Sequence, residues 1–268
     1  MNPVTTAQLE SIVGAFHEPD IAAFRALLAR TAAELPGDLA ELGAFYGRSA
    51  VLIGSSLGAG ETFTVVDLFG QEADDASNAA ENADSYPGLT QAAFEDNYRR
   101  VHGTLPVVVR GFSQTVVEHV PPGTHRFVHV DASHLYEHVV QDIEAAHRIL
   151  QDDGVLVLDD IRSEHTPGVA AAAWQAVLRD GLRPFAISPF KLYATFGDPA
   201  RWQPALQELA DTGVVRSEVQ RVNDLDLLRF WSLPRPEPVL PWRRYVPEVA
   251  WPAVSRVGGA ALKAGRRR

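Results

Sequence analysis

The sequence contains no cysteine among its 268 residues. Disulfides, cysteine-based zinc sites and thiol nucleophiles are therefore excluded for this chain. It also lacks any stretch approaching the roughly 20 apolar residues of a membrane span, and its first residues, MNPVTTAQLESIVGAF, lack the basic start and apolar run of a secretory signal. We therefore predict a cytoplasmic protein that makes no contact with a membrane.

Positive charge is scarce, because 24 lysines and arginines face 34 acidic residues, which gives a formal net charge of -10. This balance disfavours a general affinity for nucleic acid, since the phosphate backbone selects basic surfaces. A small or neutral substrate is the better expectation. The exception is the C-terminal end from Arg256 to Arg268, which carries five basic residues and no acid. Such an end is either a frayed, solvated tail or a contact for an anionic partner.

The composition, with 46% apolar and 22% charged residues, is that of a folded globular protein. We predict one large domain with extensions. Residues 1–36 form a helical lead-in, because apolar side chains recur at helical spacing from Ile21 to Leu28 and Pro36-Gly37 ends the pattern. Residues 37–232 form the main domain. Residues 233–268 form an irregular extension, rich in proline and tryptophan, that packs across a surface or a second subunit; a homo-oligomer is left open.

Short β-type runs alternate with helical ones in the main domain, as in LAEL, TFTVVDLF, PVVVRGF, RFVHVD and GVLVLDD. Alternation of this kind predicts an α/β fold with a parallel sheet, and runs that are apolar on both sides require helices on both faces. One helix is expected from Leu135 to Leu150, ending in a turn at Asp152-Asp153-Gly154. The segment 70–105 interrupts the alternation and is interpreted as a lid, a substrate-binding elaboration or a plain surface loop.

The segment from Leu39 to Val51 has the shape of a strand, a glycine turn and a helix start. Its pattern is E-x-G-x-x-x-G and not the G-x-G-x-x-G of dinucleotide sites, which argues against a nicotinamide cofactor. Asp67 ends the next strand, where an acid can accept hydrogen bonds from both ribose hydroxyls. Each feature alone is as often a turn or a helix cap. Their order at the first two strands favours a ligand that contains adenosine but no pyrophosphate.

Acidic residues follow two later strands, Asp131 after RFVHV and Asp159-Asp160 after VLVL. Neighbouring parallel strands lie about 4.8 Å apart, so these carboxylates are expected to meet and to repel one another. A hard divalent cation such as magnesium compensates clustered carboxylates, whereas capping of the following segments would explain each acid singly. His134 lies three residues after Asp131, and a histidine, with its pKa of about 6.5, is a suitable proton acceptor at neutral pH.

These motifs together resemble the class I methyltransferases of the group that includes macrolide-sugar O-methyltransferases. The resemblance is carried by ELGAFYGRSAVLI, FTVVDLFG, FVHVDASHLYEHVVQDIEAAHRIL and GVLVLDDI followed by HTPGV, from Leu39 to Val169. It implies a Rossmann-like, mostly parallel seven-stranded sheet, with S-adenosylmethionine over the carboxyl ends of the first four strands. Some relatives carry an acid where this chain has Ser133, so proton transfer by an aspartate there is not expected.

The resemblance also implies roles for individual residues. Glu41 and Gly43 would line the methionine part of the donor, Asp67 the ribose, and the turn Gly111-Phe112-Ser113 the adenine; Gly47, Ser49 and Asp131 complete the predicted donor site. Asp131, Asp159 and Asp160 would hold magnesium, and His134 would act as the base.

We therefore expect an S-adenosylmethionine-dependent O-methyltransferase that methylates a hydroxyl of a small molecule, a natural-product sugar first and a phenol second. The alternatives are a non-catalytic S-adenosylmethionine-binding protein, a nicotinamide oxidoreductase and a different metal-dependent enzyme on the same fold. The acceptor pocket is expected from segment 70–105, the loop Arg162 to Pro167 and the stretch SPFKLYATF. Its aromatic lining would come from Tyr86, Phe94, Tyr98 and Tyr193.

Overall fold

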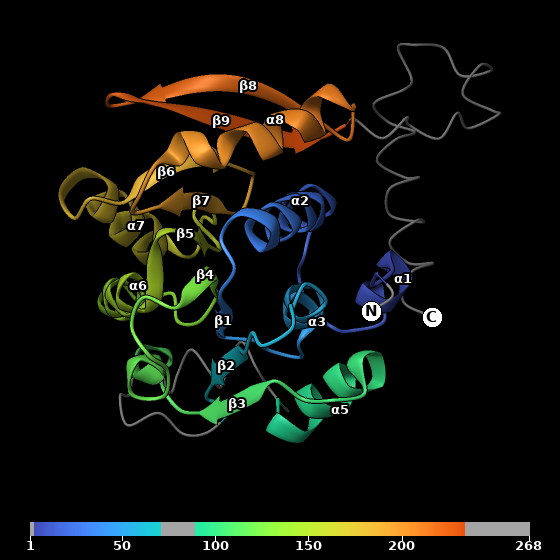
Figure 1. Cartoon of the computed structure of the whole chain (residues 1–268). Helices are drawn as coiled ribbons and strands as arrows, with labels where there is room; N and C mark the ends of the chain where they lie inside the picture. Colours follow the sequence, from blue (N-terminus) through green and yellow to red (C-terminus); the bar gives the residue numbers. More distant parts are fainter. Residues whose placement is uncertain (1–2, 71–88, 234–268) are drawn as a thin grey trace, which may run out of the picture. The chain divides into compact units, whose positions relative to one another are not determined.

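The computed structural model describes residues 3–70 and 89–233, which belong to one unit, Met1–Leu233. In these residues the strands form a single nine-stranded sheet with the order β3-β2-β1-β4-β5-β7-β6-β9-β8 (Figure 1). The strands are β1 Asp38–Leu42, β2 Phe63–Asp67, β3 Val107–Arg110, β4 His125–Val130, β5 Leu150–Leu158, β6 Arg183–Ile187, β7 Leu192–Thr195, β8 Val215–Val222 and β9 Leu225–Ser232.

The strand directions confirm the predicted α/β fold with a mostly parallel sheet. β1, β2, β3, β4 and β5 pair in parallel, whereas β7 is antiparallel to both β5 and β6. The sheet has nine strands and not the expected seven, because the antiparallel hairpin of β8 and β9 continues it. β9 pairs in parallel with β6 through Ala186 and Ile187. The hairpin therefore extends the sheet on the side away from β1.

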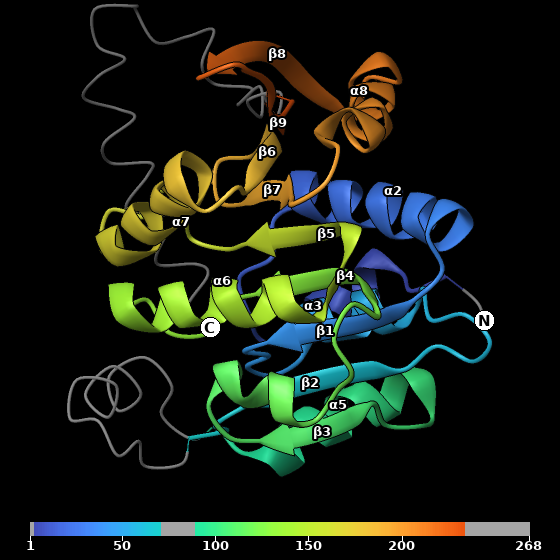
Figure 2. The same ribbon diagram turned by 60° about the vertical axis from the view of Figure 1, so that its left-hand side comes forward.

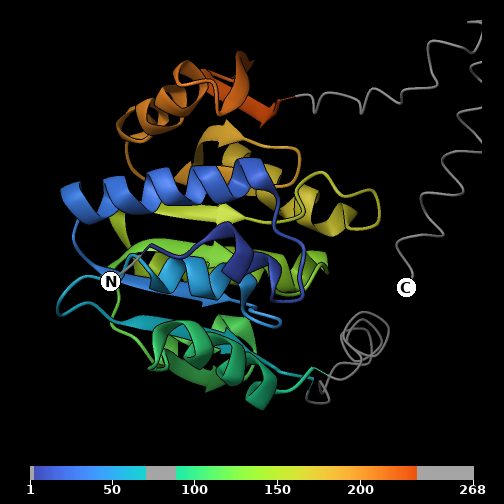
Figure 3. The same cartoon turned by 90° about the vertical axis from the view of Figure 1, so that its right-hand side faces the viewer.

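Helices cover both faces of the sheet, as its apolar strands require. α2 (Glu18–Glu34), α3 (Arg48–Gly54) and α5 (Gln91–His102) lie on one face (Figure 3), and α6 (Tyr136–Ile149) and α7 (Pro167–Arg179) lie on the other (Figure 2). The remaining helical segments within residues 3–70 and 89–233 are α1 (Thr6–Glu10), the 3-10 helices η1 (Ser113–Glu118) and η2 (Pro199–Arg201), and α8 (Gln203–Asp211). No helix in the described ranges is both long and apolar enough to cross a membrane.

Side-chain alternation along the strands separates two apolar cores. Phe127 of β4 packs toward α2 and α3, whereas its neighbour Val128 packs toward α6 and α7. The same alternation holds along β5, where Val157 and Leu158 belong to opposite cores. Because successive residues of a strand point to opposite faces, the parity of a residue number decides which face receives its side chain.

The helix predicted after RFVHVD is confirmed as α6, Tyr136–Ile149. The turn predicted at Asp152-Asp153-Gly154 is wrong, because these residues lie within β5. Leu150 pairs with His125 and Val155 pairs with Phe127, so residues 151–154 form an irregularity in the ladder. The strand therefore begins directly after the helix.

Parts of the predicted extensions can be placed. α2, in the predicted lead-in, contacts β4, α3 and α8, and buries Phe24 and Leu27 completely. In the segment 70–105, α5 packs on α3; the Thr90 side chain accepts from the Ala93 N–H at its start, and Gly103, with φ 75°, ends it. Residues 71–88 and the extension 234–268 lie outside the described residues. Our domain boundaries remain predictions.

A buried ion pair joins the amino-terminal ends of the central strands. Arg126, at the start of β4, is fully buried and pairs with Glu61 at 2.9 Å. Its guanidinium also donates to the carbonyl oxygens of Gly37, Leu28 and Ser56. Burial raises the pKa of Glu61, but the hydrogen bonds from Arg126, Gly37 and Gly58 outweigh this effect and lower it below its usual value. One cation thus ties α2, β1 and the end of α3 together.

We predict that Glu61→Gln lowers the free energy of unfolding by about 3 kcal/mol at neutral pH, because Arg126 is left as an uncompensated buried charge. Since the Glu61 pKa is lowered on folding, its contribution is present above the unfolded pKa and is lost as pH falls through the folded value. Urea unfolding at pH 7 and at acidic pH measures both effects. The matched control Glu218→Gln removes an exposed pair with Arg229 and should change little; an equal loss in both variants would contradict the prediction.

Candidate methyl-donor and acid-base site

The loop that follows β1 is held by the carboxylate of Asp67. The backbone N–H groups of Ala44 and Phe45 donate to Asp67 Oδ2 at 2.6 and 3.0 Å, and the Phe69 N–H donates to Oδ1 at 2.6 Å. Phe45 has a φ of 50°, a conformation that non-glycine residues rarely adopt. Asp67 is therefore the anchor that keeps this loop in a strained shape beside β2.

Two glycines in the loop are required by close backbone approach. Gly43 has a φ of 81°, and a Cβ at this position would lie 2.1 Å from the carbonyl oxygen of Asp131. Gly47 has a φ of 90°, and its Cβ would lie 2.9 Å from the Phe94 ring. A side chain at either position would push the loop away from β4 or α5. Because neither glycine has a side chain, the loop can pack closely against the end of β4 and against α5.

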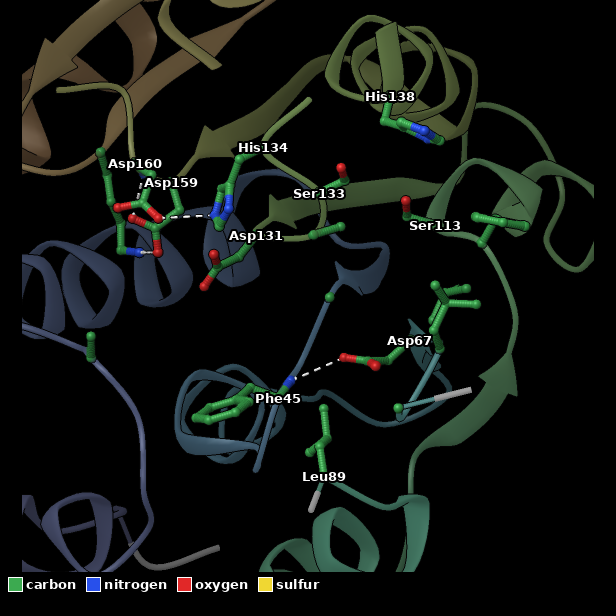
Figure 4. Close-up of a pocket in the computed structure, with 18 of the residues that line it drawn as sticks. Phe45, Asp67, Leu89, Ser113, Asp131, Ser133, His134, His138, Asp159 and Asp160 are labelled. Carbon is green, nitrogen blue, oxygen red and sulfur yellow. Dashed lines mark hydrogen bonds and ion pairs between the residues drawn. The ribbon is translucent and has the colours of Figure 1, made fainter. Parts of the chain in front are cut away.

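One pocket lies at the carboxyl ends of β1, β2, β4 and β5 (Figure 4). Most of the predicted site residues line it together, namely Gly43, Asp67, Phe112, Ser113, Asp131, His134, Asp159 and Asp160. Gly47, Ser49 and Glu41 are not among the lining residues that are described. Gly47 precedes α3 as its N-cap, Ser49 lies within α3, and Glu41 is buried in β1.

Glu41 is directed to a neighbouring strand. It is paired in register with His129 of β4, and Glu41 Oε1 lies 2.8 Å from His129 Nδ1. Burial and Lys191 lower the pKa of His129, but hydrogen bonds with Asp159 and Glu41 raise it to about 9. The other Glu41 oxygen, Oε2, is buried and has no hydrogen-bond partner among the described residues. An unpartnered buried carboxylate oxygen is costly unless a donor reaches it.

The three predicted acids do meet at one edge, but their environments differ. Burial and the charge of Asp159 raise the pKa of Asp131 to about 8. Burial raises the pKa of Asp159, but Lys191 and His129 outweigh it and hold that pKa well below its usual range. The pKa of Asp160 is lowered, first by its hydrogen bond with His134. The three carboxyl groups therefore differ in their pKa: that of Asp131 is raised, and those of Asp159 and Asp160 are lowered.

Lys191 is the residue of this site that sequence reasoning missed. The sequence places it only within SPFKLYATF, as part of a pocket wall, yet its side chain is almost fully buried and contacts Asp159 Oδ2. β7 runs antiparallel to β5 with Leu192 opposite Leu158, so the residue before β7 lies beside the residue after β5. Because Lys191 and Tyr193 are two residues apart, their side chains point to the same face of the sheet. The position of Lys191 therefore depends on the antiparallel direction of β7 and on its register with β5.

His134 lies where the sequence predicts, on the rim beside Asp131. Its Nε2 atom is 3.1 Å from Asp160 Oδ2, and its side chain is 21% exposed, so it is accessible from the pocket (Figure 4). His165, in the loop that follows Asp160, could also serve as a base from its place in the sequence, but it is exposed and is not among the described lining residues. His17 and His138 also line the pocket.

The expected aromatic wall of the acceptor pocket is wrong for three of its four residues. Phe94 and Tyr98 are buried in the core between α5 and α3, and Tyr193 is buried beneath α2 and donates to Asp20 Oδ1 at 2.6 Å. Tyr86 lies outside the described residues. The aromatic side chains of the described pocket lining come instead from Phe45, Phe112 and Phe190, with His17 stacked on Phe190 at 3.8 Å.

The donor atoms at this edge are compatible with a divalent cation. Ligand atoms of Asp131, His134 and Asp160 lie within 4.8 Å of one another, as do those of His129, Asp131 and Asp159. Carboxylate oxygens are the ligands that magnesium prefers. The group with His134 presents two carboxylates to the pocket. The group with His129 includes Asp159, whose carboxylate contacts Lys191. The pocket-facing group is the better fit.

The chain is similar to known methyltransferases in part of its sequence and in its fold. Residues 40–161 match a family model described as a methyltransferase domain. The solved structure of the O-methyltransferase NovP is 17% identical, with 67% of this chain and 80% of NovP covered and a TM-score of 0.52. CalS11, a calicheamicin methyltransferase, is 18% identical, with 67% and 79% covered and a TM-score of 0.50. At such identities the structures show a shared fold. No curated protein matches the chain in sequence.

The matched residues contain the glycine loop, Asp67, His134 and all three acids of the pocket. The matched range thus includes most of the residues that line the pocket at the carboxyl ends of β1 to β5. Residues 40–161 are therefore similar to a methyltransferase domain, and the chain shares its fold with the solved O-methyltransferase NovP.

Proposed function

We propose that the protein transfers a methyl group from S-adenosylmethionine to a hydroxyl oxygen of a small molecule, with the assistance of magnesium. The observation that carries this proposal is a single pocket with two chemically different halves. Gly43, Asp67 and Ser113 form one half, which suits the donor, and Asp131, His134 and Asp160 form the other, which suits deprotonation of a hydroxyl. Both halves lie at the carboxyl edge of the sheet (Figure 4).

The donor half offers a partner for each polar part of the donor. The loop from Gly43 lets the ligand approach the backbone closely, and Asp67 is an acceptor for the ribose hydroxyls while it anchors the loop. Phe112 and Ser113 flank the adenine position. The unpartnered Oε2 of Glu41 is an acceptor for the amino group of the methionine part. Gly47 and Ser49 support this half through the start of α3.

His134 is the proposed base. The donor supplies a methyl group that is already activated, so alignment of the acceptor oxygen behind it is the main source of acceleration. The acceptor O–H proton passes to His134, the oxygen bonds to the methyl group, and S-adenosylhomocysteine leaves. Asp160, hydrogen-bonded to Nε2, orients the imidazole and stabilises its charged form. Magnesium, when bound to Asp131 and Asp160, supplies a Lewis acid that lowers the pKa of the acceptor hydroxyl.

The proposed acceptor is a hydroxyl of a natural-product sugar, with a catechol-like phenol as the second choice. The description of CalS11 as a calicheamicin methyltransferase supports a small-molecule acceptor by analogy of fold. A non-catalytic S-adenosylmethionine-binding protein is the main alternative. The contact between His134 and Asp160 at the pocket rim favours an enzyme, because donor binding alone has no need of a positioned base.

The donor assignment predicts that Asp67→Ala weakens binding of S-adenosylhomocysteine at least tenfold, because a hydrogen bond to a charged group contributes about 1.5–3 kcal/mol. Isothermal titration calorimetry measures the affinity. Asp67→Asn keeps the shape of the side chain and should give an intermediate loss, and Asp96→Ala, which alters an exposed acid of α5, is the control. Equal affinity in the wild type and Asp67→Ala would refute the ribose assignment.

The metal assignment predicts that a chelator abolishes methyl transfer to the acceptor and that added magnesium restores it. Affinity for S-adenosylhomocysteine should be unchanged by the chelator, because the donor contacts lie in the other half of the pocket. Activity assays on hydroxylated sugars and catechols, with and without chelator, provide the measurement. Full activity in protein shown by elemental analysis to contain no metal would make the acids structural.

The base assignment predicts that His134→Ala lowers kcat about 10²- to 10⁴-fold, the usual contribution of general-base catalysis, and leaves the affinity for the donor nearly intact. The pH-rate profile should also lose a limb near neutral pH. His165→Ala is the matched control, since His165 is exposed and outside the described pocket lining. An unchanged rate and profile in His134→Ala, or a larger loss in His165→Ala, would contradict the assignment.

A further inference from the structure

Lys191 places a permanent positive charge inside the acidic edge of the pocket. It ends the turn from Ser188, whose hydroxyl accepts from the Lys191 N–H at 2.8 Å, and it precedes β7. Its position before an antiparallel strand brings it next to Asp159, which follows β5. Only 2% of the residue is exposed, so the ammonium group is screened from water and its charge acts strongly on its neighbours.

The ammonium group is held from several sides. It contacts Asp159 Oδ2, lies 3.4 Å from His129 Nε2, and stands 5.4 and 5.9 Å from the ring centroids of Phe16 and Phe24. Contacts with two aromatic rings and a carboxylate favour the charged form of a buried lysine. Lys191 is thus a buried part of the site, in contact with groups on several sides.

Both carboxylate oxygens of Asp159 consequently have donors within the protein. Its Oδ2 is taken by Lys191, and its Oδ1 accepts the Asp160 N–H at 2.8 Å. Asp160 is different, because its two oxygens contact the Ser163 hydroxyl at 2.6 Å and His134 at 3.1 Å. A hydroxyl and an imidazole can turn to make room for a cation, whereas an ammonium group repels one. The two adjacent aspartates therefore differ in their availability as ligands.

We propose that Lys191 is an internal cation of the acidic edge, which keeps Asp159 out of the metal-ligand set and weakens binding of a divalent cation by Asp131 and Asp160. Lys191 is a positioning residue in this proposal, because it acts through Asp159 and not on the acceptor. The inference rests on the proposed function for the location of the metal, and it deepens that proposal by naming the residue that sets the affinity.

The test is a titration of purified protein with Mn²⁺, followed by the electron paramagnetic resonance signal of the free ion. Lys191→Met should bind Mn²⁺ at least tenfold more tightly than the wild type, because one positive charge is lost and one carboxylate is released. Lys191→Arg retains the charge and should stay within about threefold of the wild type. The charge-matched double variant Asp159→Asn with Lys191→Met should lose the gain and return to within about threefold of the wild type.

Several results would overturn the proposal. These are unchanged or weaker Mn²⁺ binding in folded Lys191→Met, or binding more than tenfold weaker than wild type in the double variant, which would make Asp159 a ligand. Circular dichroism and S-adenosylhomocysteine affinity establish folding. If Lys191→Met does not fold, Lys191→Gln replaces it and should also bind Mn²⁺ more tightly than the wild type, by less than Lys191→Met, because the positive charge is lost while the amide can still donate to Asp159.

The same titration separates this proposal from the proposed function. If the wild type binds no Mn²⁺ and Lys191→Met does, magnesium assistance fails while the role of Lys191 stands. If neither protein binds Mn²⁺, the proposal on Lys191 is overturned. Failure of S-adenosylhomocysteine binding in the wild type would refute the donor site and leave the Mn²⁺ comparison of the variants valid.

Discussion

Repulsion among the carboxylates at the carboxyl ends of β4 and β5 is the constraint on which the site depends. Asp131, Asp159 and Asp160 are brought together by strand pairing alone, and three ionised acids cannot share such a place without compensation. The chain answers with a different solution for each. Lys191 compensates Asp159, His134 contacts Asp160, and the pKa of Asp131 is raised to about 8. Groups within the protein therefore provide part of the charge compensation that the sequence analysis assigns to a metal ion.

The donor half also relies on a small number of contacts. A single carboxylate, Asp67, receives three backbone N–H groups and fixes a loop whose glycines approach β4 and α5 closely. The loop in turn places Gly43 against the carbonyl of Asp131, so the two halves of the pocket meet through backbone packing. This contact leaves no room for a side chain at Gly43. The proposed donor half and the proposed acid-base half therefore adjoin each other through the backbone.

The order of strands and loops makes much of this site predictable from the sequence. Because parallel strands end at one edge, the sequence alone assigns Gly43, Asp67, Asp131 and Asp159 to the same place. The pairing of Glu41 with His129 is harder to predict, since register is needed to see that the two side chains face each other.

Two further positions depend on contacts that are distant along the chain. Strand parity explains why Tyr193 lies in the core and not in the pocket. The place of Lys191 follows from both the antiparallel direction of β7 and its register with β5, and neither can be obtained from local sequence.

The central claim is that two kinds of positive charge compensate the carboxylates at this edge. One is the buried ammonium group of Lys191, and the other is a divalent cation at a site that faces the pocket. A crystal structure of the wild type with S-adenosylhomocysteine and Mn²⁺, with the ion located by anomalous scattering, tests it most directly. The account predicts a manganese peak within about 2.5 Å of carboxylate oxygens of Asp131 and Asp160, with Lys191 still on Asp159. A peak on Asp159 with Lys191 displaced would contradict it.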